Sequence, residues 1–198
     1  MKEIIDLKDR MTRHLLDRFG IAPEKSTLKI YTQKEWKKFC DSELLTPRTK
    51  GVYFSGNYSA HIVYDPLLSP QLLFHEYFGH GLHDENTPLG ELTHTLENKL
   101  AEDEKKAKIT TPYELAIFRE SNPYYIELSK LLEETRERQE GFAMWMQWYL
   151  SNVSGQTGIF RNELQFLHTQ YQIGFTKILS FSETHGEEEL LRNFKILK

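Results

Sequence analysis

Three histidines and a glutamate fall within twelve residues, in the segment LLFHEYFGHGLH (72–83). Imidazole and carboxylate groups are ligands that zinc takes at catalytic sites, where three protein ligands leave one position for water. In the zinc-protease pattern H-E-x-x-H, two histidines on one helical face bind the metal and the intervening glutamate reaches the bound water. The segment therefore points to metal-assisted hydrolysis.

The spacing of the histidines departs from that pattern, because His75 and His80 are five residues apart instead of four. At about 100° per residue, five residues rotate about 140° past a full turn, so a regular helix would point the two rings apart. A π-bulge absorbs one extra residue, and such bulges are frequent at functional sites. Gly79 tolerates unusual backbone most easily. We therefore predict a local distortion at or near Gly79 that lets both histidines bind one metal.

The six residues HEYFGH (75–80) resemble the H-E-x-x-G-H motif of the dipeptidyl peptidase III family of zinc peptidases. The resemblance implies that His75 and His80 bind Zn²⁺ and that Glu76 is the general base. It also implies that a glutamate on a downstream helix is the third ligand. The order of two strands, motif helix and glutamate helix is similar to the core of a compact gluzincin, a zinc peptidase with glutamate as third ligand.

The strongest candidate for that third ligand is Glu140, in RERQEGFAMWMQWYL (136–150). The segment is charged before Glu140 and apolar after it, and a carboxylate that enters a core needs a partner. Gly141 would allow another chain segment to approach closely, and EGFA resembles segments that carry the ligand glutamate in other hydrolases. A salt bridge to Arg136 or Arg138 is the alternative interpretation. The rival ligands are His83, Glu91, His94, Glu97 and Glu137, of which His83 is either a fallback ligand or a partner of His80.

A zinc hydrolase also needs a group that stabilises the oxyanion. His168 and Tyr171 lie three residues apart in a predicted helix and are the candidates. For either residue alone, a surface histidine and a core tyrosine are the favoured interpretation. The strand AHIVYD (60–65) precedes the motif. We expect it to be an edge strand with which an extended peptide pairs.

The rest of the sequence predicts the helices and strands around these residues. A first helix ends at Gly20, and GVYFS (51–55) forms an antiparallel hairpin with strand 60–65. Ser69 and Pro70 are good starting residues for the motif helix. The other expected elements are a strand at 28–32, a loop at 84–88 and helices at 33–40, 89–107, 159–180 and 186–196. Two more helices are expected to begin within 110–114 and 121–125, and the second of these runs to about 150. The expected fold is α+β, with a small, mostly antiparallel sheet and a mainly helical C-terminal half.

Length and composition suit one domain of 198 residues, with an αβ part at 1–84 and a helical part at 85–198. The net charge of −4 gives no case for nucleic acid as a partner. The N-terminus has no apolar signal region, and no apolar run approaches the roughly 20 residues of a membrane span. With one cysteine, Cys40, the chain suits a reducing compartment. We expect a cytoplasmic protein, and the sequence leaves the oligomeric state open.

These observations predict a zinc metallopeptidase that acts on a peptide or protein. Zn²⁺ is expected on His75, His80 and Glu140, with Glu76 as the base. Two alternatives remain. One is a non-catalytic module on the same fold that binds a peptide or partner. The other is a hydrolase that uses the same residues on a non-peptide amide or ester.

Overall fold

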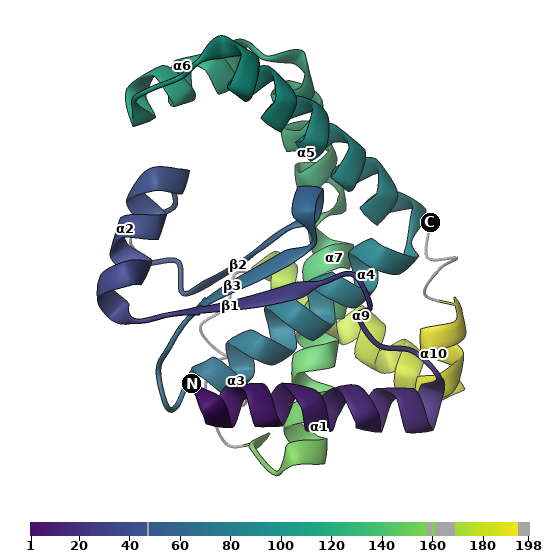
Figure 1. Cartoon of the computed structure of the whole chain (residues 1–198). Helices are drawn as coiled ribbons and strands as arrows, with labels where there is room; N and C mark the ends of the chain where they lie inside the picture. Colours follow the sequence, from purple (N-terminus) through teal and green to yellow (C-terminus); the bar gives the residue numbers. More distant parts are fainter. Residues whose placement is uncertain (47, 158–159, 161–168, 194–198) are drawn as a thin grey trace.

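The computed structural model describes residues 1–46, 48–157, 160 and 169–193. Its fold is α+β, as the sequence predicts: three short strands lie in the N-terminal third, and helices make up most of the remainder (Figure 1). The described helices are α1 (Lys2–Phe19), α2 (Gln33–Glu43), η1 (Ser55–Asn57), α3 (Ser69–Leu72), η2 (Leu73–His80), α4 (Gly81–Asn86), α5 (Pro88–Ala107), α6 (Pro112–Ser121), α7 (Pro123–Ser154), α9 (Thr169–His185) and α10 (Glu187–Asn193).

The sheet has the strand order β1-β3-β2, with β1 (Thr27–Tyr31), β2 (Gly51–Phe54) and β3 (Ser59–Val63). The predicted hairpin is confirmed, because β2 and β3 are antiparallel. Strand β3 runs parallel to β1, so the sheet is mixed. The prediction that strand 60–65 is an edge was wrong, because β3 lies in the centre and β1 and β2 form the two edges.

The two faces of this sheet meet different surroundings, because side chains alternate along a strand. Ala60 and Ile62 of β3 are fully buried in the main core, together with the motif helix. His61 and Val63 point to the other face, where Val63 packs with Trp36 of α2. One face of the sheet therefore supports the motif helix, and the other faces α2 and the helices beyond it.

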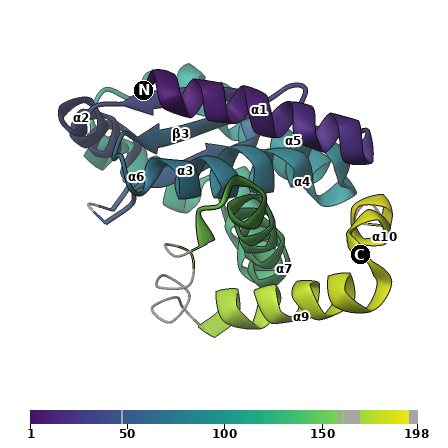
Figure 2. The ribbon, with the colours of Figure 1, turned by 90° about the horizontal axis from the view of Figure 1, so that it is seen from below.

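Helix α7 links the layers of the molecule. Figure 2 shows α7 almost end-on, between the layer of the motif helix and α9. Its second half carries most of its buried side chains, including Phe142, Trp145 and Leu150. Its first half packs with α5 and α6 around a small separate cluster that contains Leu100 and Leu128. We use the name arm for α6 together with the C-terminal end of α5 and the N-terminal end of α7.

The helix boundaries follow the predicted caps with two exceptions. Gly20 ends α1 in the left-handed conformation at φ 68°, and Thr111 and Asn122 cap α6 and α7. The predicted loop at 84–88 was wrong, because the helix continues through Asn86 as α4. Ser69 is the first helical residue of α3 instead of its cap, and its hydroxyl accepts a hydrogen bond from the Asp65 backbone.

Candidate metal centre

The motif helix contains the predicted distortion. Helices α3, η2 and α4 follow one another without a break, and η2 (Leu73–His80) is a π-helix. In a π-helix the backbone bonds join residues five apart, so two side chains with that spacing lie on the same face. The rings of His75 and His80 accordingly lie 5.0 Å apart between centroids, at 78° to each other. The distortion is thus confirmed, and it covers the whole motif.

Gly79 has a different role from the expected one. Its φ is not positive, so the π-turn does not depend on the conformational freedom of glycine. A Cβ at Gly79 would lie 2.6 Å from the Cα of Ala143 in α7, closer than non-bonded carbons approach. Glycine is therefore needed because α7 packs directly against this turn. That contact also brings the residue three positions earlier in α7, Glu140, next to the motif.

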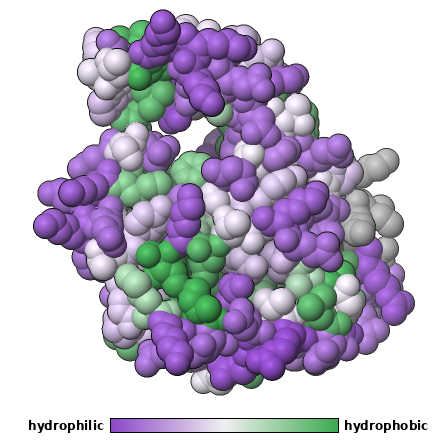
Figure 3. All heavy atoms as spheres, viewed as in Figure 1, coloured by the Kyte–Doolittle hydropathy of each residue, from purple (hydrophilic) through white to green (hydrophobic). Residues whose placement is uncertain are grey.

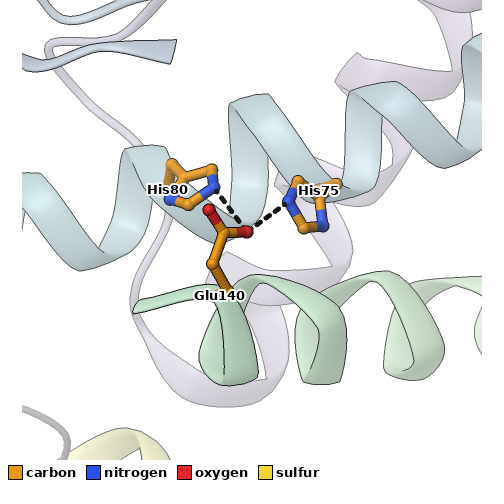
Figure 4. A group of neighbouring side chains, drawn as sticks. All are labelled: His75, His80 and Glu140. Carbon is orange, nitrogen blue, oxygen red and sulfur yellow. Dashed lines mark hydrogen bonds and ion pairs between the residues drawn. The ribbon is translucent and has the colours of Figure 1, made fainter. Parts of the chain in front are cut away.

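Glu140 lies between the two histidines, as Figure 4 shows. Its Oε2 is 3.1 Å from Nε2 of His75 and 3.6 Å from Nε2 of His80. The three candidate ligand atoms all lie within 4.8 Å of one another. Gly141 allows a close approach as predicted, because a Cβ there would lie 2.5 Å from the backbone of Gly174 in α9.

The charges of these groups depend on one another. Burial lowers the pKa of His80, but the negative charge of Glu140 and a hydrogen bond to it outweigh burial and raise the pKa to about 9. Burial raises the pKa of Glu140, but His80 and His75 hold it well below its usual range. A carboxylate that lies between two imidazoles stabilises positive charge at this point. Two nitrogens and one oxygen also form the donor set that zinc prefers, so the residues fit a zinc ion.

Glu76 is buried beside the cluster, with 8% of its surface exposed. Burial raises the pKa of its carboxyl group. The side chain occupies the space next to Gly51 in β2, where a Cβ would lie 2.7 Å from Oε1 of Glu76. Gly51 was not among the predicted site residues. A glycine inside a strand, which often marks a close approach, was the available signal.

The cluster opens into a cavity of about 590 Å³, which we call the metal cavity. Tyr171 of α9 lines this cavity, and burial raises its pKa to about 12, with Glu140 adding to the effect through its charge and a hydrogen bond. The prediction that Tyr171 faces the site therefore agrees with its position. His168, the other oxyanion candidate, lies outside the described residues.

The rival ligands have other positions or partners. Glu91 is exposed, and none of the five joins the cluster of ligand atoms among the described residues. The partners of the others are Asp84 for His83, the Ser55 carbonyl for His94, the Gly56 amide for Glu97 and Lys177 for Glu137.

The structure adds cavity residues that sequence analysis did not identify. Arg48 and Lys50 precede β2, and Asp84 of α4 is buried where Ser55 donates a hydrogen bond to it. No local pattern marked the two basic residues. Asp84 follows His80 by four residues and was assigned to a loop, so its position on the motif helix was missed.

Comparison of the chain with protein-family models, curated proteins and solved structures finds no match. Among the described helices, none combines the length and apolar character that a membrane-spanning helix needs.

Proposed function

We propose that this protein is a zinc-dependent hydrolase, and that it acts as a metallopeptidase. The observation that carries the proposal is the π-helical turn that brings His75 and His80 to the same carboxylate, with Glu76 beside them. A two-histidine, one-glutamate donor set leaves one position of a tetrahedral zinc site for water or substrate.

A bound zinc ion supplies a Lewis acid that lowers the pKa of water and polarises a carbonyl oxygen. Glu76 takes a proton from the attacking water and passes it to the nitrogen of the leaving amine. Its burial suits both steps, because a raised pKa brings the carboxyl group closer to neutral pH. Tyr171, which lines the same cavity, donates a hydrogen bond from its hydroxyl to the developing oxyanion.

The edge strand β2 supports a peptide as the substrate. Its residues line the metal cavity along one side, and His80 stacks near Tyr53 with 6.3 Å between ring centroids. In the described sheet, β2 has a partner strand only on the β3 side. An extended peptide can add to its free edge through backbone hydrogen bonds and so lie across the cluster. We also propose a cytoplasmic location, which rests on the single cysteine, Cys40, being buried and free.

The test is proteolysis of casein and of a mixed peptide library by the purified, zinc-reconstituted protein. We expect cleavage that a chelator abolishes and added zinc restores. Glu76→Gln should bind zinc and lose cleavage. Cleavage by the chelated protein, or undiminished cleavage by Glu76→Gln, would overturn the proposed mechanism. Hydrolysis of small esters or amides without peptide cleavage would instead assign the same residues to a non-peptide substrate.

A further inference from the structure

The metal cavity has a defined direction, because β2, the motif helix and α7 all run along it. Gly51, the first residue of β2, lies against Glu76 of the motif helix. Further along β2, Tyr53 lies beside His80, and after its end Ser55 is bonded to Asp84. The motif helix therefore runs in the same direction as β2. Helix α7 runs the opposite way, since Gln147 of α7 is bonded to Gln71 before the motif.

The two ends of this cavity carry opposite charges. The end at the start of β2 is lined by Arg48 and Lys50. The other end is lined by Asp84 and Glu97, and both carboxylates belong to helices that follow the motif. The cluster of His75, His80 and Glu140 lies between the two ends.

The basic end is held in place by its backbone. The Thr49 carbonyl, between Arg48 and Lys50, accepts a hydrogen bond of 2.9 Å from the indole of Trp36. The Lys50 carbonyl accepts one of 3.0 Å from Val63 of β3. Neither cation forms an ion pair with any residue that the structure describes. Their charges are thus available to a ligand in the cavity.

A peptide that adds to β2 in the antiparallel direction meets these charges in a fixed order. Its N-terminal part lies toward Ser55, Asp84 and Glu97, and its C-terminal part lies toward Lys50 and Arg48. A parallel peptide would place its C-terminal carboxylate at the end lined by Asp84, where like charges repel. The charges of the cavity therefore favour the antiparallel direction.

We propose that Arg48 and Lys50 select substrates that carry a carboxylate shortly after the scissile bond. This inference rests on the proposed peptidase function and names the substrate class of that site. The carboxylate can be the free C-terminus of a short peptide or the side chain of Asp or Glu. Both sources present the same chemistry to the two cations.

The position of the carboxylate follows from the register. Glu76, the proposed general base, lies against Gly51. The scissile bond of the substrate therefore lies near Gly51. Residues of an extended chain are spaced about 3.4 Å apart. The first and second residues after the scissile bond therefore lie opposite Lys50 and Thr49, at the end of the cavity that Lys50 and Arg48 line.

The experiment begins with the zinc-reconstituted full chain and a library of proteome-derived peptides, whose cleavage products are identified by mass spectrometry. We expect enrichment of Asp, Glu or a free C-terminus at the first two positions after the cleaved bond. The best-cleaved sequence is then synthesised with Glu or Gln at the enriched position, and with a free or amidated C-terminus. These two pairs separate a side-chain carboxylate from a terminal one.

The variant is Arg48→Gln/Lys50→Gln, and the control is Lys37→Gln/Lys38→Gln, which removes two exposed charges from α2 outside the metal cavity. For wild type and control we expect kcat/KM to favour the peptide with the carboxylate by about three- to tenfold, the scale of one or two partly exposed ion pairs. This preference should shrink in 1 M salt and vanish in the variant. The variant should cleave the uncharged peptide normally, which separates lost selectivity from lost folding.

Two negative results of this experiment would have different consequences. If wild type cleaves the matched peptides equally, or if the variant keeps the preference, the assignment of Arg48 and Lys50 is wrong while the peptidase function stands. If zinc-loaded wild type cleaves no peptide, the proposed function fails and the selectivity fails with it.

Discussion

Two cavities of similar size lie on different sides of the sheet, and both contain histidine and glutamate. The second cavity, of about 480 Å³, is lined by β1, β3, α2 and the arm. Figure 3 shows a hollow between the arm and the body below it. Glu97 lines both cavities. The same residue types thus occur in two settings within one chain.

The histidines of the two cavities differ in their partners. His61 of the second cavity is hydrogen-bonded through its ring nitrogens to Tyr31 and Ser59, at 2.8 Å each, and stacks on Phe39. Burial, with a smaller effect from Lys29, lowers its pKa to about 4. His80 faces Glu140, and its pKa is raised to about 9. A buried histidine that has hydroxyl partners stays neutral, whereas two histidines that share a carboxylate attract a cation.

This difference shows that convergence on a carboxylate, and not burial of histidine, distinguishes the candidate metal centre. Among the described residues, His75, His80 and Glu140 form the one group of three potential ligands that converges. The following predictions compare a residue of this centre with a matched residue elsewhere.

The largest expected effect is on turnover. Glu76→Gln removes the carboxylate that moves the proton and should lower kcat by about 10²- to 10⁴-fold. Glu43→Gln makes the same chemical change in the second cavity and should leave kcat unchanged. Steady-state kinetics and zinc content are measured together for both variants. An equal loss in both, or loss of zinc in Glu76→Gln, would contradict the assigned role of Glu76.

The next effect is on stabilisation by zinc. A metal that binds the folded chain at 100 times its Kd stabilises it by about 2.7 kcal/mol. His80→Ala should abolish this gain in thermal or chemical denaturation. His61→Ala should lower stability in the absence of metal but keep the full gain on adding zinc. If added zinc still stabilises His80→Ala, the metal binds elsewhere.

A smaller effect is expected from the contact between α7 and the motif helix. Gly79→Ala drives a methyl group into the Ala143 backbone and should destabilise the protein by about 1–3 kcal/mol. It should also weaken zinc binding, because it separates Glu140 from the histidines. The control is Gly81→Ala on the same helix, whose new methyl group would meet the Ser26 hydroxyl instead of backbone. Urea denaturation with and without zinc measures both, and equal costs would refute the account of Gly79.

An effect of similar size concerns Glu97, which lines both cavities. Burial raises its pKa from 4.5 to about 7. Between these values the folded chain binds more protons than the unfolded chain. The stabilisation is therefore complete below pH 4.5 and is lost as the pH rises through 7. Relative to wild type, Glu97→Gln should gain on the order of 1–3 kcal/mol between pH 4.5 and pH 8. A stability difference that is independent of pH would rule out the raised pKa.

The distortion of the motif helix and the convergence of the candidate ligands could be predicted better than the elements around them. The five-residue spacing of His75 and His80 requires a π-turn if both bind one metal, so the distortion followed from local geometry. The change from charged to apolar residues at Glu140 also lies within one segment. The purpose of Gly79 was missed because it depends on Ala143, which is distant in sequence.

The sheet order could not be predicted for the same reason. Strands β1 and β2 are joined through α2, and this connection leaves open which of them pairs on which side of β3. The basic residues Arg48 and Lys50 follow no periodic pattern, so only the fold shows that they line the cavity. Local patterns therefore predicted that His75, His80 and Glu140 converge, whereas the edge strand and the charge of the cavity depend on long-range packing.

The central claim is that His75, His80 and Glu140 hold one metal ion, and zinc stoichiometry tests it most directly. Elemental analysis should find close to one zinc per chain in the reconstituted, desalted wild type and in His61→Ala. His75→Ala, His80→Ala and Glu140→Ala should each retain almost none while remaining folded by circular dichroism. A wild type without zinc, or a folded His80→Ala or Glu140→Ala that retains one zinc per chain, would contradict the claim.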